Sequence, residues 1–238
     1  MLTIDGSIGE GGGQILRTCL ALSTCLQRPF RLTNIRAARK KPGLQPQHLT
    51  AVTAAAAISQ AEVEGADKGS QQLLFKPHAI TPGDYHFAIG TAGSTSLVLQ
   101  TLLPALILAD KPSTLLLEGG THNPLAPTFD YMEKVFLPLL NRMGPTVTAK
   151  LERPGFAPEG GGRVRVAIRP SPRLLPLELH ERGEITEQYA EVLLAHLPEH
   201  IAQRELAVIA SSLAWPESAL RYRKIESVKM PANIVSII

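Results

Sequence analysis

The 238-residue chain has few of the features that mark disulfide-bonded or membrane-spanning proteins. Its two cysteines, Cys19 and Cys25, lie in one apolar stretch, so neither a disulfide framework nor a cysteine metal site is expected, and a reducing compartment fits. The longest apolar run, SLVLQTLLPALILAD, is interrupted by Gln100 and Pro104 and is too short to span a bilayer. The first residues show no signal-peptide pattern. We therefore expect a cytoplasmic protein that does not bind membranes.

Acidic residues are missing from residues 11–61, which carry seven basic side chains and a formal charge of +7. The rest of the chain carries 17 basic and 21 acidic side chains, a formal charge of −4. This segregation favours a positive surface that faces an anionic ligand, because Lys and Arg hold most phosphate-rich partners. A solvated basic face without a ligand is the alternative.

The periodicity of apolar residues predicts helices at residues 14–26, 47–61, 95–109 and 127–143, with short strands between them. Two successive segments read in the same order: strand, glycine or small-residue loop, helix, strand, helix and two closing strands. The period is about eighty residues, which indicates a duplicated unit in a fold of the α+β class.

The pattern changes after RPSPRLLP, whose prolines favour a connector. A strand at 185–195 and a helix at 198–215 follow, and the sequence finishes on the apolar run NIVSII. We expect a large domain over residues 1–179 and the beginning of a smaller one over 180–238. NIVSII is expected to lack pairing partners, in a domain that continues past the residues given.

The segment GEGGGQILR, residues 9–17, lacks the Lys-Ser or Lys-Thr of a phosphate-binding P-loop and fits no dinucleotide-binding unit. Glycines between a strand and a helix nevertheless leave backbone N–H groups free for an oxyanion. Arg17 lies one turn into that helix, where its guanidinium suits phosphate. Glu10 beside such a loop is typical of a site that also holds Mg²⁺ or a ribose hydroxyl. A turn without a ligand remains the alternative.

Further polar side chains stand in the other predicted loops. RAARKKPGLQPQH, residues 36–48, carries four cations and then Gln47 and His48 at a helix start, a pattern suited to phosphates and ribose. Gln100 on an apolar helix is either a core amide or a ligand contact, and His122 with Asn123 is either functional or a turn former. The seven histidines show no metal-ligand spacing, so no metal site is assigned from protein ligands.

Five blocks together resemble the RNA 3′-terminal phosphate cyclase family: DGSIGEGGGQILR, IRAARKKPGLQPQHLTAV, AIGTAGSTSLVLQTLLPAL, GGTHNPLAP and PGFAPEGGG. The likeness runs along essentially the whole chain. In the family's glycine signature a basic residue directly precedes the first glycine, whereas Pro154 stands there in this sequence and the basic Arg153 is displaced by one.

The resemblance implies an ATP-dependent ligase, acting in RNA processing, that converts an RNA 3′-phosphate end into a 2′,3′-cyclic phosphodiester. It works through an adenylylated histidine, transfer of AMP to the RNA phosphate, and attack by the neighbouring 2′-hydroxyl. ATP and Mg²⁺ are the implied cofactors, and RNA with a 3′-phosphate end is the implied partner. Matching positions assign ATP binding to Glu10, Gln100 and Pro127, and phosphate or RNA binding to Arg17, Arg39 and Gln47.

The resemblance also implies initiation-factor-like repeats, shared with enolpyruvyl transferases, and a small inserted α/β domain. The family's nucleophilic histidine is expected beyond residue 238, so the catalytic residue is unknown within this sequence and the chain as written is expected to be inactive. An enolpyruvyl-transferase-like enzyme and a non-catalytic RNA-binding factor in ribosome assembly are the alternatives. Homo-oligomerisation is left open.

Overall fold

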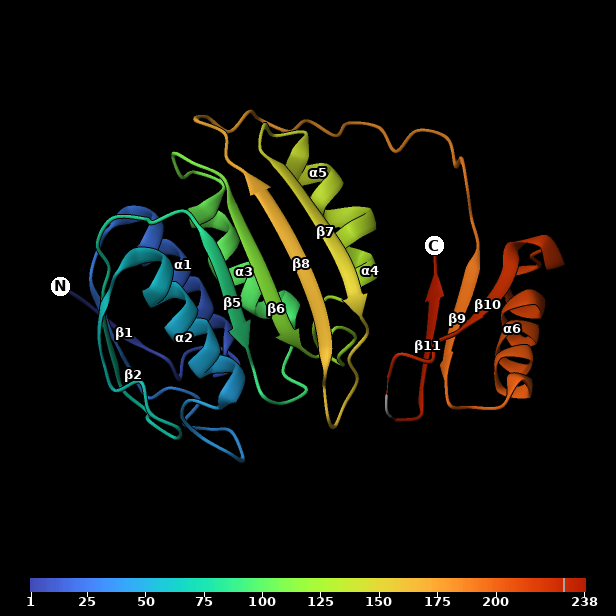
Figure 1. Cartoon of the computed structure of the whole chain (residues 1–238), viewed down its shortest axis with the longest axis horizontal. Coiled ribbons are helices and arrows are strands. Elements are labelled where there is room, and N and C mark those ends of the chain that lie inside the picture. The colour runs from blue at the N-terminus through green and yellow to red at the C-terminus, as the bar shows by residue number, and fades with distance from the viewer. Residues whose placement is uncertain (229) are drawn as a thin grey trace. The chain divides into compact units, whose positions relative to one another are not determined.

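The computed structural model describes residues 1–228 and 230–238. The chain divides into two units, Met1–Leu177 and Glu178–Ile238 (Figure 1). The first unit contains two four-stranded sheets and the second contains a three-stranded sheet, so the fold mixes helices and sheets as an α+β protein does. Within the described residues, none of the helices combines the length and the apolar character that a membrane span requires.

The first sheet has the strand order β1-β2-β4-β3. Its strands are β1 (Leu2–Asp5), β2 (Phe30–Thr33), β3 (Glu62–Glu64) and β4 (Leu73–Lys76). Helix α1 (Gln14–Leu26) connects β1 to β2, which run parallel because a helical crossover returns the chain in the same direction. Helix α2 (Pro46–Ser59) follows β2, and β4 then pairs antiparallel with both β2 and β3.

The second sheet has the strand order β5-β6-β8-β7. As in the first sheet, the first pair in this order is parallel and the other two pairs are antiparallel. Its strands are β5 (Asp84–Ala88), β6 (Ser113–Gly119), β7 (Thr146–Arg153) and β8 (Gly162–Arg169). Helix α3 (Thr95–Leu106) connects β5 to β6, and a helical segment of three parts precedes β7. These parts are α4 (Phe129–Tyr131), the π-helix Met132–Phe136 and α5 (Leu137–Asn141).

The widened π-helical turn comes just before Pro138. Leu137 N–H donates to the Met132 carbonyl, five residues earlier, instead of to the residue four before it. Proline has no N–H, and its ring would clash with the carbonyl four residues before it. A wider turn relieves that clash, so the predicted continuous helix at 127–143 is divided.

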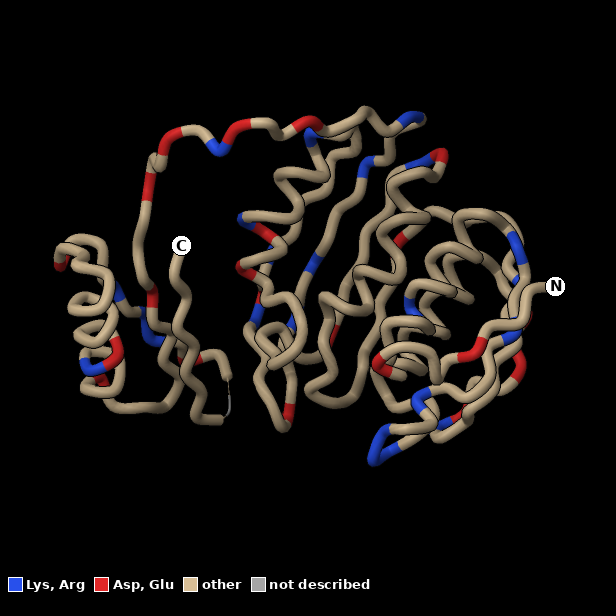
Figure 2. The backbone as a smooth tube through the Cα atoms, turned by 180° about the vertical axis from the view of Figure 1, so that it is seen from behind, with Lys and Arg blue, Asp and Glu red and all other residues tan. Residues whose placement is uncertain are grey.

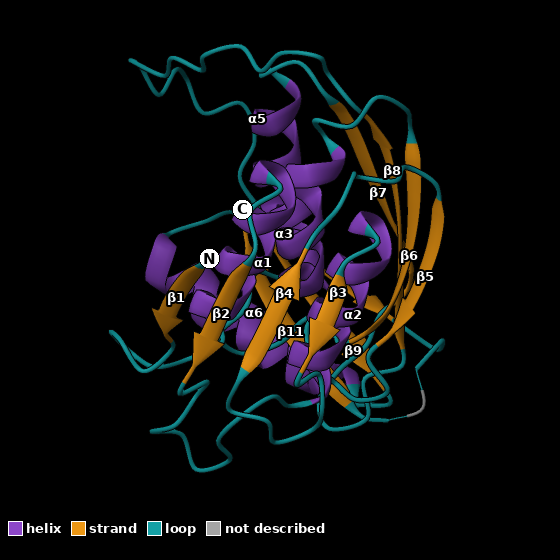
Figure 3. Ribbon diagram, turned by 90° about the vertical axis from the view of Figure 1, so that its left-hand side faces the viewer, coloured by secondary structure: helices purple, strands orange, loops and turns teal. Residues whose placement is uncertain are grey.

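Helices α1, α2 and α3 lie between the two sheets of the first unit (Figure 3). One hydrophobic core joins both sheets and these helices, and it includes the fully buried Leu20, Phe75, Leu102 and Leu117. Strand β6 alternates buried and half-buried positions, as a sheet with one face on a core requires. The three helices pack against one another in this core, so α1 and α2 are both held against α3.

The second unit is built around the central strand β9 (Ala190–Ala195), whose neighbours are β10 (Leu220–Lys224) and β11 (Ala232–Ile237). Helix α6 (Glu199–Leu213) and a short 3₁₀ turn at Glu217–Ala219 complete it. Its small core is formed by Ala190, Val192, Leu194, Ala202, Leu206 and Ile209.

The expectation that NIVSII lacks pairing partners is wrong. Strand β11 pairs antiparallel with β9 along its whole length, and Ile238 and Tyr189 exchange two backbone hydrogen bonds of 2.9 Å. The reason lies in β9, where the side chains Val192 to Ala195 are all buried and the strand therefore takes a central position with neighbours on both edges.

Candidate anion and nucleotide site

The glycine loop, residues 9–13, connects β1 to α1. Gly9 and Gly11 have φ of +66° and +57°, a backbone conformation that residues other than glycine rarely adopt. Gly13 caps α1 without a side chain that could accept a hydrogen bond from the first turn, and that turn contains no acidic residue. The first N–H groups of α1 are therefore available to an anion at the positive end of the helix.

Arg17 is buried next to this loop with 8% of its surface exposed. Its Nη2 donates a hydrogen bond of 2.8 Å to Gln14 Oε1, whereas its buried Nε has no hydrogen-bond partner. Burial lowers the pKa of the guanidinium, and the nearby Glu10 carboxylate opposes that shift. A buried charge with an unpaired donor is costly unless a ligand satisfies it, so Arg17 is the strongest single indication of an anion site.

Arg39 reaches the same loop from the basic segment at 36–41, where the backbone is coloured blue for Lys and Arg at a lower tip of the first unit in Figure 2. Its Nη2 donates to Glu10 Oε1 at 2.8 Å and to the Glu10 carbonyl at 3.2 Å. Both side chains are solvent-exposed, so the ion pair is weak, about 0–1 kcal/mol, and open to competition by another anion. Arg36 instead donates to backbone carbonyls of Lys41 and Gly43, which holds the basic loop in shape.

The side chain of His48 closes the loop from the start of α2. A Cβ atom placed on Gly13 would meet His48 Nε2 and would lie 2.8 Å from Arg17 Nη1, so both side chains converge on this glycine. The Gln45 N–H donates to His48 Nδ1 at 3.2 Å. Burial, together with the positive charges of Arg36 and Arg17, lowers the pKa of His48 to about 4, so the ring is neutral at pH 7. The sequence indicated His48 only through its place beside Gln47 at a helix start.

Gln47 faces a different loop. Its Oε1 accepts a hydrogen bond of 2.8 Å from the Ser94 N–H, at the start of α3. Gln47 thus ties α2 to the loop before α3, while Arg17, Arg39 and His48 surround the glycine loop.

Gln100 and Pro127 line one cavity of about 320 Å³ on α3. Its other lining side chains are Ser96, Leu103, Pro104, Ile107, Tyr131, Met132, Phe136 and Leu140. Pro104 has no N–H for the Gln100 carbonyl, so this helix loses one internal hydrogen bond at the cavity wall. A mostly apolar hollow with a few polar groups is typical of small-ligand sites, which measure about 300–1,000 Å³. Glu10 does not line this cavity and lies with Arg39 at the glycine loop.

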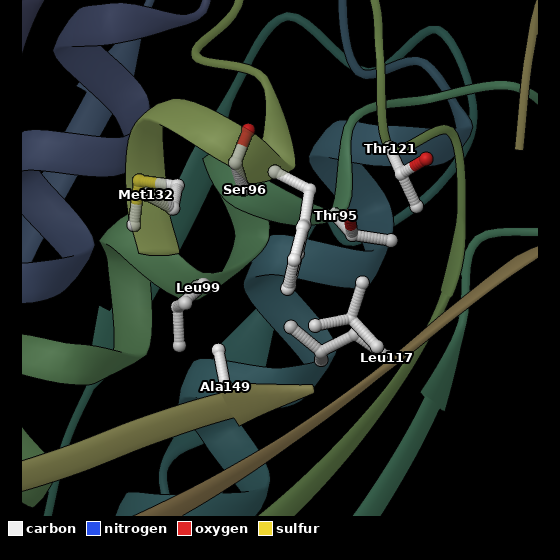
Figure 4. A pocket seen from close by; sticks show the side chains of 9 residues that line it. Thr95, Ser96, Leu99, Leu117, Thr121, Met132 and Ala149 are labelled. Carbon is white, nitrogen blue, oxygen red and sulfur yellow. The ribbon is translucent and has the colours of Figure 1, made fainter. Parts of the chain in front are cut away.

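The wall of this cavity is closely packed from behind. Ser96 Oγ donates to the Pro127 carbonyl at 2.6 Å and so fixes the loop to α3. Behind Ser96 and Met132, the side chains of Thr95, Leu99 and Leu117 leave a gap of only about 10 Å³ (Figure 4). Such a gap is about the size of one water molecule, so it is a feature of packing and not a second ligand site.

His122 is buried, and both of its ring nitrogens are hydrogen-bonded. Its Nε2 hydrogen-bonds Asp130 Oδ2 at 2.8 Å and its Nδ1 hydrogen-bonds Thr121 Oγ1 at 2.7 Å, while only 2% of its side chain is exposed. The Thr121 hydroxyl in turn accepts from the Gly155 N–H at 3.0 Å. The network joins the loop before Pro127 to the loop after β7, and it holds the pocket wall in place.

Among the described residues, no group of three or more His, Cys, Asp or Glu side chains is placed to hold a metal ion. Glu10, within the glycine loop, supplies a carboxylate that pairs with Arg39 and lies near Arg17. A metal here would therefore take most of its ligands from phosphate oxygens and water, as Mg²⁺ commonly does.

Comparisons with known proteins agree on one family. A family model described as RNA 3′-terminal phosphate cyclase matches residues 8–232. A protein of that name from Koribacter versatilis (strain Ellin345) is 53% identical over 237 residues, which cover 100% of this chain and 67% of the relative. Another from Ectopseudomonas mendocina (strain ymp) is 54% identical over 234 residues, or 98% of this chain and 68% of the relative.

Proposed function

Because the chain belongs to the RNA 3′-terminal phosphate cyclase family, we propose that it serves the ATP-dependent conversion of RNA 3′-phosphate ends into 2′,3′-cyclic phosphodiesters. The observation that carries the proposal is Arg17, a buried guanidinium with an unpaired Nε beside a glycine loop at a helix N-terminus. In this reaction ATP supplies an adenylyl group that activates the terminal phosphate toward the neighbouring 2′-hydroxyl. The chain's own task is to bring the phosphates together and offset their repulsion.

We assign the phosphates to the glycine loop. Arg17 supplies a fixed charge there, and Arg39 supplies a second one once an incoming phosphate displaces Glu10 from it. Gln47 supports the arrangement by tying α2 to the Ser94 loop. The released Glu10 carboxylate is then free to bind Mg²⁺ or a ribose hydroxyl, the role that the resemblance gives it in the ATP site.

We assign the base of the nucleotide to the cavity lined by Gln100 and Pro127. Its apolar lining suits the faces of a flat aromatic ring, and Gln100 supplies an amide that can donate and accept at the ring edge. The hydrogen bond from Ser96 Oγ to the Pro127 carbonyl fixes the loop that forms one wall of the cavity.

We infer that the two four-stranded sheets are copies of one duplicated unit of the initiation-factor type, and that the second unit corresponds to the family's small inserted domain. The equal strand order and pairing of the two sheets support the first inference. The change to a three-stranded sheet after residue 177 supports the second.

We further propose that none of the seven histidines of this chain becomes adenylylated. His48 accepts a backbone N–H at Nδ1, and both ring nitrogens of His122 are hydrogen-bonded in a buried network. His78 and His86 are half-exposed and lie 3.8 and 3.3 Å from Glu62 and Glu118. Incubation with labelled ATP and Mg²⁺, followed by peptide mapping, should give no stable label on any histidine. Label on any of the seven contradicts this assignment.

The proposed RNA binding is tested with two short RNAs of one sequence, one ending in a 3′-phosphate and one in a 3′-hydroxyl. Fluorescence anisotropy should show tighter binding of the phosphate end, and Arg39→Ala should remove most of that preference while lowering the salt slope by about one. Arg28→Ala is the matched control, since Arg28 is an exposed arginine just beyond the other end of α1. Equal binding of the two RNAs at several salt concentrations refutes the proposal.

A further inference from the structure

His48 is a polar side chain at the glycine loop that no assignment above uses. It stands in the first turn of α2, 31 positions after Arg17 in the sequence, and yet both side chains meet at Gly13. Gly13 carries no side chain, and a Cβ atom there would collide with the imidazole. The ring is therefore close enough to share a small ligand with Arg17 and the N-terminus of α1.

The orientation of the imidazole fixes which nitrogen carries the proton. The Gln45 N–H donates to Nδ1, so Nδ1 is the acceptor and the single proton of the neutral ring lies on Nε2. Nε2 is the atom that faces Gly13. Its N–H thus points toward the region that Arg17 borders, and it donates no hydrogen bond to another of the described residues.

From this geometry we propose that His48 is an anion-binding residue. Its Nε2–H donates to the same phosphate group that Arg17 and the N-terminal N–H groups of α1 bind. The proposal deepens the proposed function and rests on it for the identity of the anion. A neutral donor adds a hydrogen bond without adding a third positive charge next to Arg17 and Arg36, the two cations that face the ring. It also donates equally to a singly or doubly charged phosphate.

Two substitutions separate anion binding from a merely structural cap. His48→Asn places an amide oxygen near the position of Nδ1, so it keeps the acceptor for the Gln45 N–H and loses the donor at Gly13. His48→Gln places an amide nitrogen near the position of Nε2, so it keeps the donor and loses the cap. His86→Gln is the control, because His86 is half-exposed and 3.3 Å from Glu118 on a different sheet.

The measurement is calorimetric binding of sulfate, which stays doubly charged across the pH range, to the 238-residue chain and its variants at pH 7. We expect His48→Asn to weaken sulfate binding about tenfold, the value of one lost hydrogen bond to a charged group, while His48→Gln stays close to the parent chain. Thermal unfolding of each variant checks that it is folded. The reverse order, with Asn binding as tightly as the parent and Gln binding weakly, overturns the proposal and makes His48 a cap.

The RNA pair described above distinguishes this proposal from the proposed function. If sulfate binding follows His48 as expected but the two RNAs bind equally, His48 is an anion ligand and the assignment of RNA phosphate is wrong. If the RNA preference for a 3′-phosphate holds and neither His48 variant changes sulfate or RNA affinity, the proposal for His48 is refuted by itself.

Discussion

Replacing Arg17 by methionine removes a buried guanidinium and keeps a long unbranched side chain in its place. In the parent chain the unpaired Nε–H costs about 1–3 kcal/mol, and the hydrogen bond from Nη2 to Gln14 returns only about 0.5–1.5 kcal/mol. Methionine fills most of the volume and leaves no polar atom unsatisfied. We therefore expect Arg17→Met to stabilise the folded chain by about 1 kcal/mol and to raise its Tm by about 2–4 °C.

The same substitution should remove the ability of sulfate to stabilise the protein. A ligand at 100 times its Kd adds about 2.7 kcal/mol to the free energy of unfolding, and this increment requires the charge that methionine lacks. Urea unfolding of both chains with and without sulfate measures the two effects together. Arg28→Met is the control, because Arg28 is exposed and its loss leaves no buried space.

Two results would refute this reasoning. A destabilisation of about 2 kcal/mol or more without sulfate would mean that the guanidinium is satisfied inside the fold and holds α1 in place. An equal sulfate increment in the parent chain and in Arg17→Met would mean that the anion binds elsewhere.

Three further outcomes follow from the same contacts. Lowering the pH from about 6.5 to about 4 should destabilise the chain through His48, because burial lowers the pKa of the folded imidazole to about 4 and the unfolded imidazole takes up the proton first. In urea titrations, His48→Gln should reduce this fall in the free energy of unfolding between about pH 6.5 and about pH 4. The hydrogen bond from His122 holds the pKa of Asp130 below the ordinary value of 3.8. The ionised Asp130 therefore stabilises the folded chain above pH 3.8, and this stabilisation is lost as the pH falls through the lowered pKa. Asp130→Asn should accordingly cost about 2 kcal/mol at pH 7, and the difference from the parent should shrink near pH 3 in thermal scans. Gly13→Ala should abolish sulfate binding in calorimetry and also lower the Tm, because the new methyl group would collide with the His48 imidazole and crowd the Arg17 guanidinium.

Local sequence determined most of the secondary structure. The apolar spacing of residues 14–26 and the β-branched and aromatic residues of the strands predicted the elements that the structure contains, because periodicity reports which face of each element is buried. The acid-free stretch predicted a positive site, since charge is a property of composition that folding does not change. The five blocks of residues indicated the family, which the comparisons confirm.

Tertiary structure decided which distant residues meet. No pattern in the sequence indicates that His48, and not Gln47, turns toward Gly13, because adjacent positions on a helix point about 100° apart and the packing of α2 against α3 selects the direction. The pairing of 232–237 with β9 is equally non-local: a strand's own residues encode its extended form, whereas its partner is chosen by the free edge of a buried strand elsewhere. Arg17 was visible in the sequence as a cation, but only the fold buried it and left its Nε without a partner, and burial is what makes that charge require an anion.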